Sequence, residues 1–320
     1  MIRLVLQALG RGCVVIVVAL TATFAVLHMV PGDPARLLVG SQADADTLAR
    51  ARAHLGLDEP LAVQYLLMLR NTARGDLGES YRTRRPVSSI LAERLWPSVE
   101  LTVAALLLQL LVGIPLGVLA ARHRGRWPDM AIGAGSLVAL STPGFVFGTT
   151  LLYVVGYRLG WLPIVGYGQG ALQHLAHLVL PALSLAFVGV AMVAQLVRGE
   201  LVRAMDEDYV RSARAKGLSE SRVIWRHALA PVLPPVLAAI GVEFGLLLTG
   251  AVAVESIFGW PGLGREALQA VLELDIPLIM GIVIVSAVAI TLVNVVVELL
   301  QRALNPRLAD EPDPRSKTAP

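Results

Sequence analysis

The sequence predicts an all-α membrane protein, because the chain is far more apolar than a soluble domain and its apolar residues gather in six long runs. Hydrophobic residues make up 55% of the 320 residues and charged residues only 16%, whereas soluble domains average about 45–50% and about 25%. A helix that crosses a bilayer reads as a stretch of about 18 or more apolar residues. Six runs meet or approach this length: 13–30, 99–121, 130–157, 175–197, 231–254 and 277–300.

The first run, residues 13–30, is expected to be a retained anchor. It is longer than the apolar core of a signal peptide, which has about 7–15 residues, and five more runs follow it. Residues 1–12 then form a cytoplasmic N-terminus. Cys13 is the single cysteine of the chain, so it cannot form an internal disulfide and is expected to be a small packing residue.

Basic residues orient the chain, since the cytoplasmic loops of membrane proteins carry an excess of arginine and lysine. With the N-terminus inside, the cytoplasmic segments hold 16 of the 27 basic residues, and two short outer loops hold one each, Arg158 and Arg265. The other nine lie in the outer segment 31–97, which is too long to count fully. Both termini are therefore expected inside. The net charge of +3 follows from this bias, and no nucleic-acid partner is expected.

The outer segment 31–97 is predicted to form a helical cap between the first and second spanning helices. Residues 44–57 and 60–73 show amphipathic helical spacing, and Pro60 suits the first position of a helix. The sequence GDLG (Gly75–Gly78) ends the second pattern. A mobile polar loop is the alternative.

The other five spans, within residues 98–300, form the predicted helical core. Two of them contain proline-rich breaks: STPGF (Ser141–Phe145) inside the third and PVLPP (Pro231–Pro235) at the start of the fifth. Proline removes a backbone hydrogen bond from a helix, so both places predict bends. Residues 301–320 form a cytoplasmic tail, whose end, Asp310–Pro320, is polar, proline-rich and expected to be disordered.

A charged loop, residues 198–230, separates the fourth and fifth spans. Within it, Asp208 suits the positive end of a helix dipole, and Arg214 and Lys216 suit the negative end. Gly217 follows at the position where a left-handed residue ends a helix, and a second helix can begin just beyond it. The pattern predicts a short helix, a glycine turn and a second helix that leads into the fifth span.

The first of these short helices is predicted to be amphipathic. Three basic side chains face water and three apolar ones form the other side, namely Arg211, Arg214 and Lys216 against Tyr209, Val210 and Ala213. A short amphipathic helix that projects from a bundle suits the groove of a partner protein. A helix lying flat on lipid headgroups, held by its basic residues, is the alternative.

The stretch DYVRSARAKGLSESRVIWRHAL (Asp208–Leu229) resembles the cytoplasmic coupling loop of ATP-binding-cassette importer permeases, and most closely that of the dipeptide/oligopeptide branch. Only Ala213 and Gly217 match the general motif of the superfamily, Glu-Ala-Ala with a later glycine, and the usual Leu-Pro close is displaced. These departures look typical of the peptide branch. Six further stretches resemble the same branch in chain order: HMVPGDPA (His28–Ala35), LGLDEPLAVQY (Leu55–Tyr65), GDLGESY (Gly75–Tyr81), GIPLGVLAA (Gly113–Ala121), ESIFGWPGLG (Glu255–Gly264) and NPRL (Asn305–Leu308).

The resemblance implies a permease subunit that forms half of a translocation pathway in the bacterial inner membrane. It implies four kinds of partner: the lipid bilayer, a second homologous permease chain, two cytoplasmic ATPase subunits or domains, and an extracytoplasmic substrate-binding protein. It also implies alternating access driven by ATP. The residues that it assigns to ATPase docking are Asp208, Tyr209, Arg211, Ala213, Arg214, Lys216 and Gly217.

The chain itself cannot contain a phosphate-binding loop of the form GxxxxGK[ST]. Its only lysines, Lys216 and Lys317, follow Ala215 and Ser316 and not glycine. Either transport is coupled to an ion gradient, or ATP is hydrolysed on another subunit. The resemblance implies the second, with ATP and Mg on the partner subunits, no cofactor on this chain and no enzymatic activity of its own.

Ionisable residues inside spans are functional candidates, because burying them in a membrane is costly. Glu243 lies deepest, in the fifth run, and is expected either to line the pathway or to bond a neighbouring helix. Asn294 is the second candidate, although buried amides commonly join helices. Glu100 and Glu298 are expected to be solvated ends.

Two other classes of function compete with this one. A membrane-embedded enzyme would need a nucleophile–base pair or a metal cluster, but the six histidines all lie in loops or at span edges. His174 and His177 resemble half of a metal site without matching ligands, so neither a catalytic nor a metal site is predicted. An ion-coupled carrier usually has more spans and more buried charge. The cargo implied is a di- or oligopeptide, with a nickel chelate, glutathione or an opine as alternatives.

Overall fold

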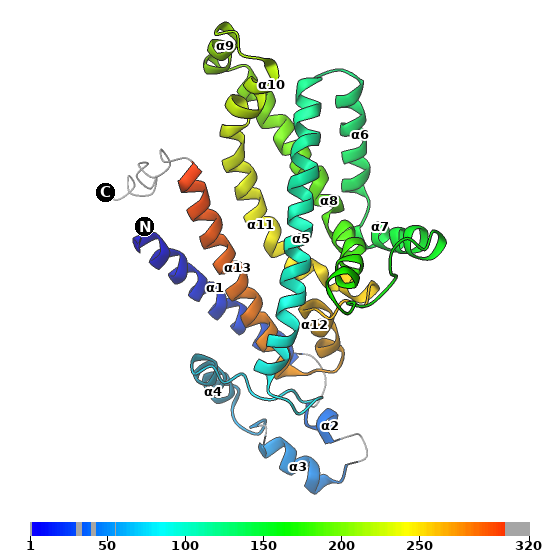
Figure 1. Ribbon diagram of the computed structural model, residues 1–320. Coiled ribbons are helices and arrows are strands. Elements are labelled where there is room, and N and C mark those ends of the chain that lie inside the picture. Colours follow the sequence, from blue (N-terminus) through cyan, green and yellow to red (C-terminus); the bar gives the residue numbers. More distant parts are fainter. Residues whose placement is uncertain (1, 30–33, 40–42, 55, 305–320) are drawn as a thin grey trace, which may run out of the picture. The chain divides into compact units, whose positions relative to one another are not determined.

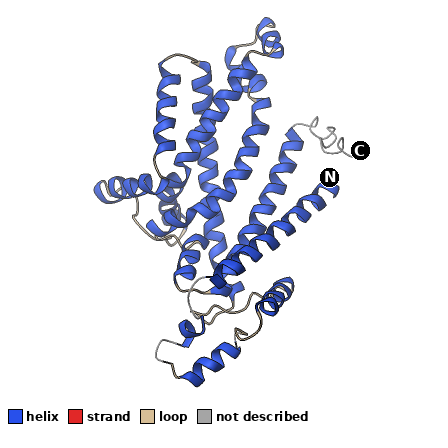
Figure 2. Cartoon of the chain, turned by 180° about the vertical axis from the view of Figure 1, so that it is seen from behind, coloured by secondary structure: helices blue, strands red, loops and turns tan. Residues whose placement is uncertain are grey.

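The computed structural model describes residues 2–29, 34–39, 43–54 and 56–304 (Figure 1). These residues are mostly helical, and the one pairing of extended backbone among them is an isolated antiparallel bridge between Glu79 and Pro86 (Figure 2). The predicted all-α fold class is confirmed. The predicted disorder of Asp310–Pro320 concerns residues outside the described part of the chain.

The helices belong to two compact units whose segments alternate along the chain. The first unit comprises Met1–Val99, Thr249–Ser256 and Trp260–Thr291, and the second comprises Glu100–Leu248, Ile257–Gly259 and Leu292–Pro320. Three long helices contribute residues to both units: α5 (Val87–Arg122), α11 (Leu233–Ile257) and α13 (Ile276–Leu304).

Five helical segments are long and apolar enough to cross a membrane. They are Gly10–Met29 within α1 (Ile2–Met29), α5, α8 (Ala171–Met205), Glu220–Leu248, and Ile276–Gln301 within α13. A sixth candidate is a pair of helices joined at a sharp bend, Trp127–Ser141 and Gly144–Arg158. Each of the six predicted runs overlaps one of these segments with different bounds, and the count reaches six only when the bent pair is one span.

The bend in the third run has a local cause. α6 (Trp127–Ser141) ends before Thr142, and α7 (Gly144–Leu151) begins after Pro143 and continues as the π-helical turn η1 (Leu152–Arg158). Proline lacks a backbone N–H and pushes the residue before it toward an extended conformation. Thr142 accordingly has φ −101° and ψ 121°, and the two helices meet at 100°. The STPGF motif therefore marks a break and not a gentle kink.

The second predicted break lies at the start of the fifth span. There α10 (Glu220–Arg222) is followed by a π-helical turn, η2 (Val223–Ala228), and a 3₁₀ turn, η3 (Ala230–Val232), before α11 begins at Leu233. The prolines of PVLPP thus lie in the turns and the first residues of α11. Backbone N–H groups at the start of a helix have no acceptor within the helix, so proline removes no hydrogen bond there.

In the first unit, the segment after α1 forms three short helices: α2 (Pro34–Val39), α3 (Ala45–His54) and α4 (Leu61–Ala73). Two of them match the amphipathic stretches of the sequence. α4 packs on α1, since the Tyr65 hydroxyl lies 2.6 Å from the Thr21 hydroxyl and its ring meets Phe24 edge-on. α5 begins at Val87, within the residues that the sequence assigned to the outer segment.

A buried carboxylate ties the loop after α4 to the start of α13. Asp275 accepts hydrogen bonds from the Ser80 hydroxyl at 2.5 Å and from the Tyr81 and Arg82 backbone N–H groups at 3.1 and 3.3 Å. The Arg82 guanidinium adds an ion pair with Glu273 at 3.0 Å. The loop is therefore held by residues that lie almost two hundred positions away in the sequence.

A second buried carboxylate, Glu255, organises the ESIFGWPGLG stretch. Glu255 accepts hydrogen bonds from the Ser98 hydroxyl at 2.5 Å and the Arg265 N–H at 2.8 Å. The Trp260 indole donates to the Pro97 carbonyl at 2.9 Å. These bonds connect the end of α11, the short helix α12 (Leu263–Leu272) and α5 within the first unit, so this stretch has a structural role.

The core of the second unit lies where α8, the charged loop and the start of α11 meet. α9 (Asp208–Ala215) follows α8 after a two-residue turn and lies with α10 at one end of α8 and α11 (Figure 1). Buried side chains from α8, α9, η2 and α11 form one cluster, including Val197, Leu201, Val210, Ala213, Val223, Ile224 and Val236. The charged loop is thus a packed part of this unit.

Candidate functional site

The charged loop has the helix–turn–helix geometry that the sequence predicts. α9 ends at Ala215, and Lys216 closes it with its N–H on the Ser212 carbonyl at 3.1 Å. Gly217 has φ +76°, a left-handed value that residues with a Cβ reach only at a cost of roughly 1–2 kcal/mol. The direction of the chain after α9 therefore depends on this glycine.

The surroundings of the Arg214 side chain differ from those that the sequence predicts. The sequence places its guanidinium in water, but the structure pairs it with Glu220 at 3.1 and 2.8 Å, and a third bond reaches the Met205 carbonyl at 3.4 Å. Arg214 thus joins the end of α8, α9 and α10 across the glycine turn. Sequence periodicity missed this because the bond runs across the turn and not along one helix face.

The two faces of α9 have different surroundings. Val210 and Ala213 are buried, with 0% and 6% of their surface exposed, against α8, η2 and α11. The side chains of Tyr209, Arg211 and Lys216 are exposed. Asp208, also exposed, lies 3.4 Å from Arg211. The face that remains open is therefore polar and carries one aromatic ring.

An ion pair near this loop was not predicted. Arg198 of α8 donates to both carboxylate oxygens of Asp129 in α6, at 2.5 and 2.7 Å, and the Gly125 N–H completes the contact at 2.9 Å. Asp129 is buried. Its position two residues after the start of an apolar helix is the only local signal, and it does not reveal the partner.

Glu243 lies half-buried in α11, near a second polar group that the sequence did not single out. Its carboxyl group interacts with the Gln109 carboxamide of α5. Within the described part of the chain, neither polar atom of Gln109 completes a hydrogen bond of normal geometry, and both are buried. Gly189 of α8 leaves the space for this amide, because a Cβ there would lie 2.1 Å from its nitrogen.

Asn294 is not brought together with Glu243. A Cβ on Gly241 would lie 3.3 Å from the Asn294 carbonyl oxygen, so the amide approaches α11 at that residue. Gly241 and Glu243 are two residues apart and point to roughly opposite sides of a helix with 3.6 residues per turn. The two pathway candidates therefore lie on different sides of α11.

Glu100 and His174, expected as a solvated end and half of a metal site, form one polar cluster in the second unit. Glu100 lies 2.5 Å from the His174 Nε2 and accepts a hydrogen bond from the Tyr167 hydroxyl at 3.0 Å. Burial and this hydrogen bond raise the pKa of Tyr167 to about 12. His177 contacts the Gln173 carbonyl of its own helix. The described residues contain no group of three or more metal-ligating side chains.

Comparison with known families covers nearly the whole chain. Residues 113–310 match the family described as binding-protein-dependent transport system inner membrane component, and residues 1–102 match the N-terminal part of such components. The glutathione transport system permease protein GsiC of Salmonella choleraesuis is 37% identical over 308 residues, which is 96% of this chain and 99% of that protein. The protein of the same name from Escherichia coli K12 is 39% identical over 285 residues, 89% of this chain and 92% of its own.

Solved structures agree at the level of the fold. An inward-facing structure of the MetNI methionine ABC transporter matches 68% of this chain and 97% of its own, with a TM-score of 0.55 and 16% identity. A crystal structure of an amino acid ABC transporter with histidines matches 68% of this chain and 94% of its own, with a TM-score of 0.50 and 20% identity. The resemblance carried by the motifs is confirmed. The chain belongs to the binding-protein-dependent transport system inner membrane components, and it is the membrane-spanning permease subunit of an ATP-binding-cassette importer.

Proposed function

We propose that the chain forms half of the translocation pathway for short peptides, beside a second homologous permease chain. The observation that carries the coupling part of this proposal is α9, a short helix whose apolar residues are used inside the protein and whose polar face stays open. Such a face is suited to a partner protein. It is poorly suited to lie on lipid, because interfacial helices bury an apolar face among the headgroups.

The partner for α9 is a cytoplasmic ATPase subunit. The face that would contact it comprises Asp208, Tyr209, Arg211 and Lys216. Ala213, Arg214 and Gly217 instead fix the position of the helix through contacts and backbone conformation within this chain. ATP and Mg bind to that subunit, since the two lysines of this chain lie outside any phosphate-binding loop. ATP then shifts the equilibrium between two states of the transporter only if it binds them with different free energies.

The pathway candidate supported best is the pair Glu243 and Gln109. The Gln109 amide is buried and, beyond its contact with Glu243, completes no hydrogen bond of normal geometry. Burying such an incompletely bonded amide is destabilising by roughly 1–3 kcal/mol, so its retention inside the helices favours a role in another state or with a ligand. Asn294, on the other side of α11, fits a helix-joining amide as well as the pathway role that the sequence suggested.

The cargo follows from chemistry shared with the relatives. The relatives named above are glutathione permease proteins, and glutathione is a tripeptide. A di- or tripeptide is therefore the proposed cargo, delivered by an extracytoplasmic binding protein. Glutathione itself, an opine or a nickel chelate are the alternatives for the same architecture.

One reconstitution tests this function. The complete transporter is placed in proteoliposomes with its binding protein. Uptake of labelled trialanine, labelled glutathione and a labelled nickel chelate is measured with ATP or with a proton or sodium gradient. Uptake of trialanine that requires ATP supports the proposal, and ATP-dependent uptake of glutathione alone would assign the glutathione alternative. Uptake driven by a gradient without ATP would establish the ion-coupled carrier. Uptake of a nickel chelate alone would assign the alternative cargo.

A further inference from the structure

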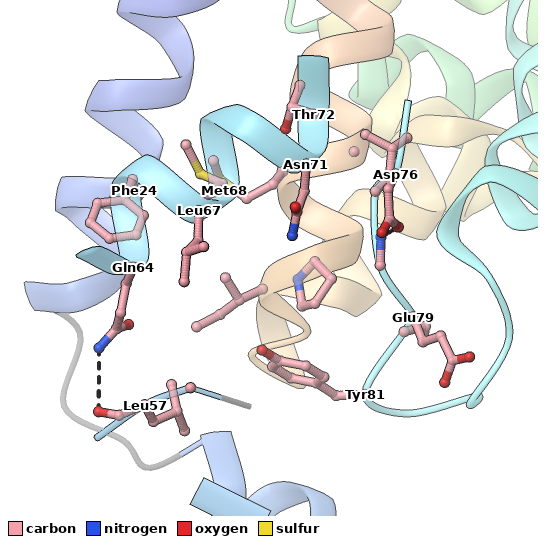
Figure 3. A pocket seen from close by; sticks show the side chains of 18 of the residues that line it. Phe24, Leu57, Gln64, Leu67, Met68, Asn71, Thr72, Asp76, Glu79 and Tyr81 are labelled. Carbon is pink, nitrogen blue, oxygen red and sulfur yellow. Dashed lines mark hydrogen bonds between the residues drawn. The ribbon is translucent and has the colours of Figure 1, made fainter. Parts of the chain in front are cut away.

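A cavity of about 650 Å³ lies within the first unit, among α1, α4, the loop of residues 76–84 and the start of α13 (Figure 3). Ligand sites commonly enclose about 300–1,000 Å³ with apolar walls and a few polar groups. We propose that this cavity is a binding site for the amino-terminal end of a short peptide, separate from the Glu243 and Gln109 pair. The inference rests on the proposed peptide cargo. It adds the place at which the permease first binds the peptide and the chemical groups that bind it.

The walls of the cavity are suited to an apolar side chain. The apolar lining comes from three helices: Phe24 of α1, Leu67 and Met68 of α4, and Ile276 and Met280 of α13. Methionine is unbranched and adapts to different shapes, which suits a site that takes varied side chains. These walls therefore favour contact with the side chains of a peptide without selecting one residue type.

Two polar groups enter this apolar space and have no partner among the described residues. The Tyr81 ring reaches in from the loop with its hydroxyl leading, and the Asn71 carboxamide points in from α4 (Figure 3). Burial and the nearby Asp275 raise the pKa of Tyr81 to about 12, so its hydroxyl stays protonated and can donate at neutral pH. An amide and a phenol together match the carbonyl and N–H groups of a peptide bond.

The charge of the lining favours a cationic group. Glu59, Asp76 and Glu79 line the cavity against one guanidinium, that of Arg84. Asp76 lies beside Asn71 (Figure 3), since its N–H bonds the Asn71 carbonyl at 3.0 Å. Its carboxylate is oriented by the Gly78 N–H at 3.0 Å.

If Asn71 and Tyr81 bind the first peptide bond of a peptide, its free ammonium group lies close to that bond and hence to the acidic side chains of the lining. The site therefore prefers a neutral peptide with a free amino terminus to an N-acetylated peptide. It also prefers such a peptide to glutathione, which carries a second carboxylate.

The test measures peptide binding to the assembled transporter in lipid nanodiscs, without the binding protein and without ATP. Labelled trialanine is the probe, and N-acetyl-trialanine and glutathione are competitors. Wild type should bind trialanine at least about tenfold more tightly than either competitor. Tyr81→Phe and Asn71→Ala should each weaken trialanine binding about 3–10-fold, because each removes one hydrogen bond. Asp76→Asn should reduce the ratio between the affinities for trialanine and for N-acetyl-trialanine, because it removes the negative charge that favours the free amine.

Arg70→Ala is the matched control, because Arg70 neighbours Asn71 on α4, is exposed and does not line the cavity. It should bind trialanine within about twofold of wild type. The proposal is overturned if wild type does not bind trialanine or if Tyr81→Phe and Asn71→Ala bind it like wild type. It is also overturned if Arg70→Ala weakens trialanine binding as much as those two changes do. Uptake of trialanine measured in parallel separates the two claims. Uptake without binding rejects this cavity alone, whereas cavity-dependent binding without uptake rejects only the peptide cargo.

Discussion

Gly217 and Arg214 hold α9 by different physical means. Gly217 provides a backbone conformation that other residues adopt only with strain, and nothing lies within 4 Å of where its Cβ would be. Arg214 provides a bidentate ion pair with Glu220 across the same turn. A change at the first therefore acts through backbone strain alone, and a change at the second acts through charge.

Gly217→Val should weaken the coupling between ATP hydrolysis and transport. The valine destabilises the left-handed turn by roughly 1–2 kcal/mol and tilts α9. Gly199→Val is the control, since Gly199 lies in the helical part of α8 with open space around its Cβ position. The measurement is substrate-stimulated ATP hydrolysis by the reconstituted transporter. Full stimulation in Gly217→Val would contradict the coupling role of α9.

Charge reversal at Arg214 distinguishes an internal role from a contact with the ATPase. Arg214→Glu places two carboxylates together and should lower stimulated hydrolysis. The exchange Arg214→Glu with Glu220→Arg should restore most of it, because the pair is re-formed within the chain. The effect is modest, below about 1 kcal/mol, since both side chains are partly exposed. Failure of the exchange to restore hydrolysis would assign Arg214 to the ATPase contact.

Residue roles were predictable from the sequence only where the signal is local. The left-handed position of Gly217 follows from its neighbours, so the sequence located it. The pairings of Glu100 with His174, and of Ser80 with Asp275, join residues 74 and 195 positions apart. No periodicity in one sequence reveals such partners.

At the scale of elements, the breaks between helices could be placed, but their geometry could not. STPGF located the break between α6 and α7, whereas the 100° angle depends on the extended backbone at Thr142 and Pro143. The start of α5 at Val87 was missed, because the polar residues of its first turns resemble a loop. Similarly, the apolar side of α9 was predicted, but the sequence could not show that it is buried inside the protein.

Asp275 should control the order of the loop before α5. Asp275→Ala leaves the Ser80 hydroxyl and the Tyr81 and Arg82 N–H groups without their acceptor, each a loss of about 1–3 kcal/mol where the group stays buried. Hydrogen exchange at residues 80–82 should become at least tenfold faster. Asp58→Ala is the control, because Asp58 is exposed and its ion pair with Arg52 is long, at 3.7 Å. Unchanged exchange in Asp275→Ala would show that other contacts hold the loop.

At the scale of the whole molecule, the charge bias predicts both termini and the charged loop inside, with α4 outside. In a Cys13→Ser background, Arg74→Cys should react with a membrane-impermeant maleimide on intact cells, whereas Arg211→Cys should react only after permeabilisation. Both residues are exposed, unlike Ser80, which is 1% exposed and unsuitable as a reporter. The reverse labelling pattern would invert the topology.

The position of Lys216 makes limited proteolysis a direct probe of α9. It is one of two lysines, and it is exposed at the end of α9. The other, Lys317, lies three residues before Pro320. A protease that cuts only after lysine therefore cuts residues 1–316 at a single place, the peptide bond between Lys216 and Gly217. Shielding of that peptide bond would report occupancy of α9 directly, with no label and no substitution in the chain.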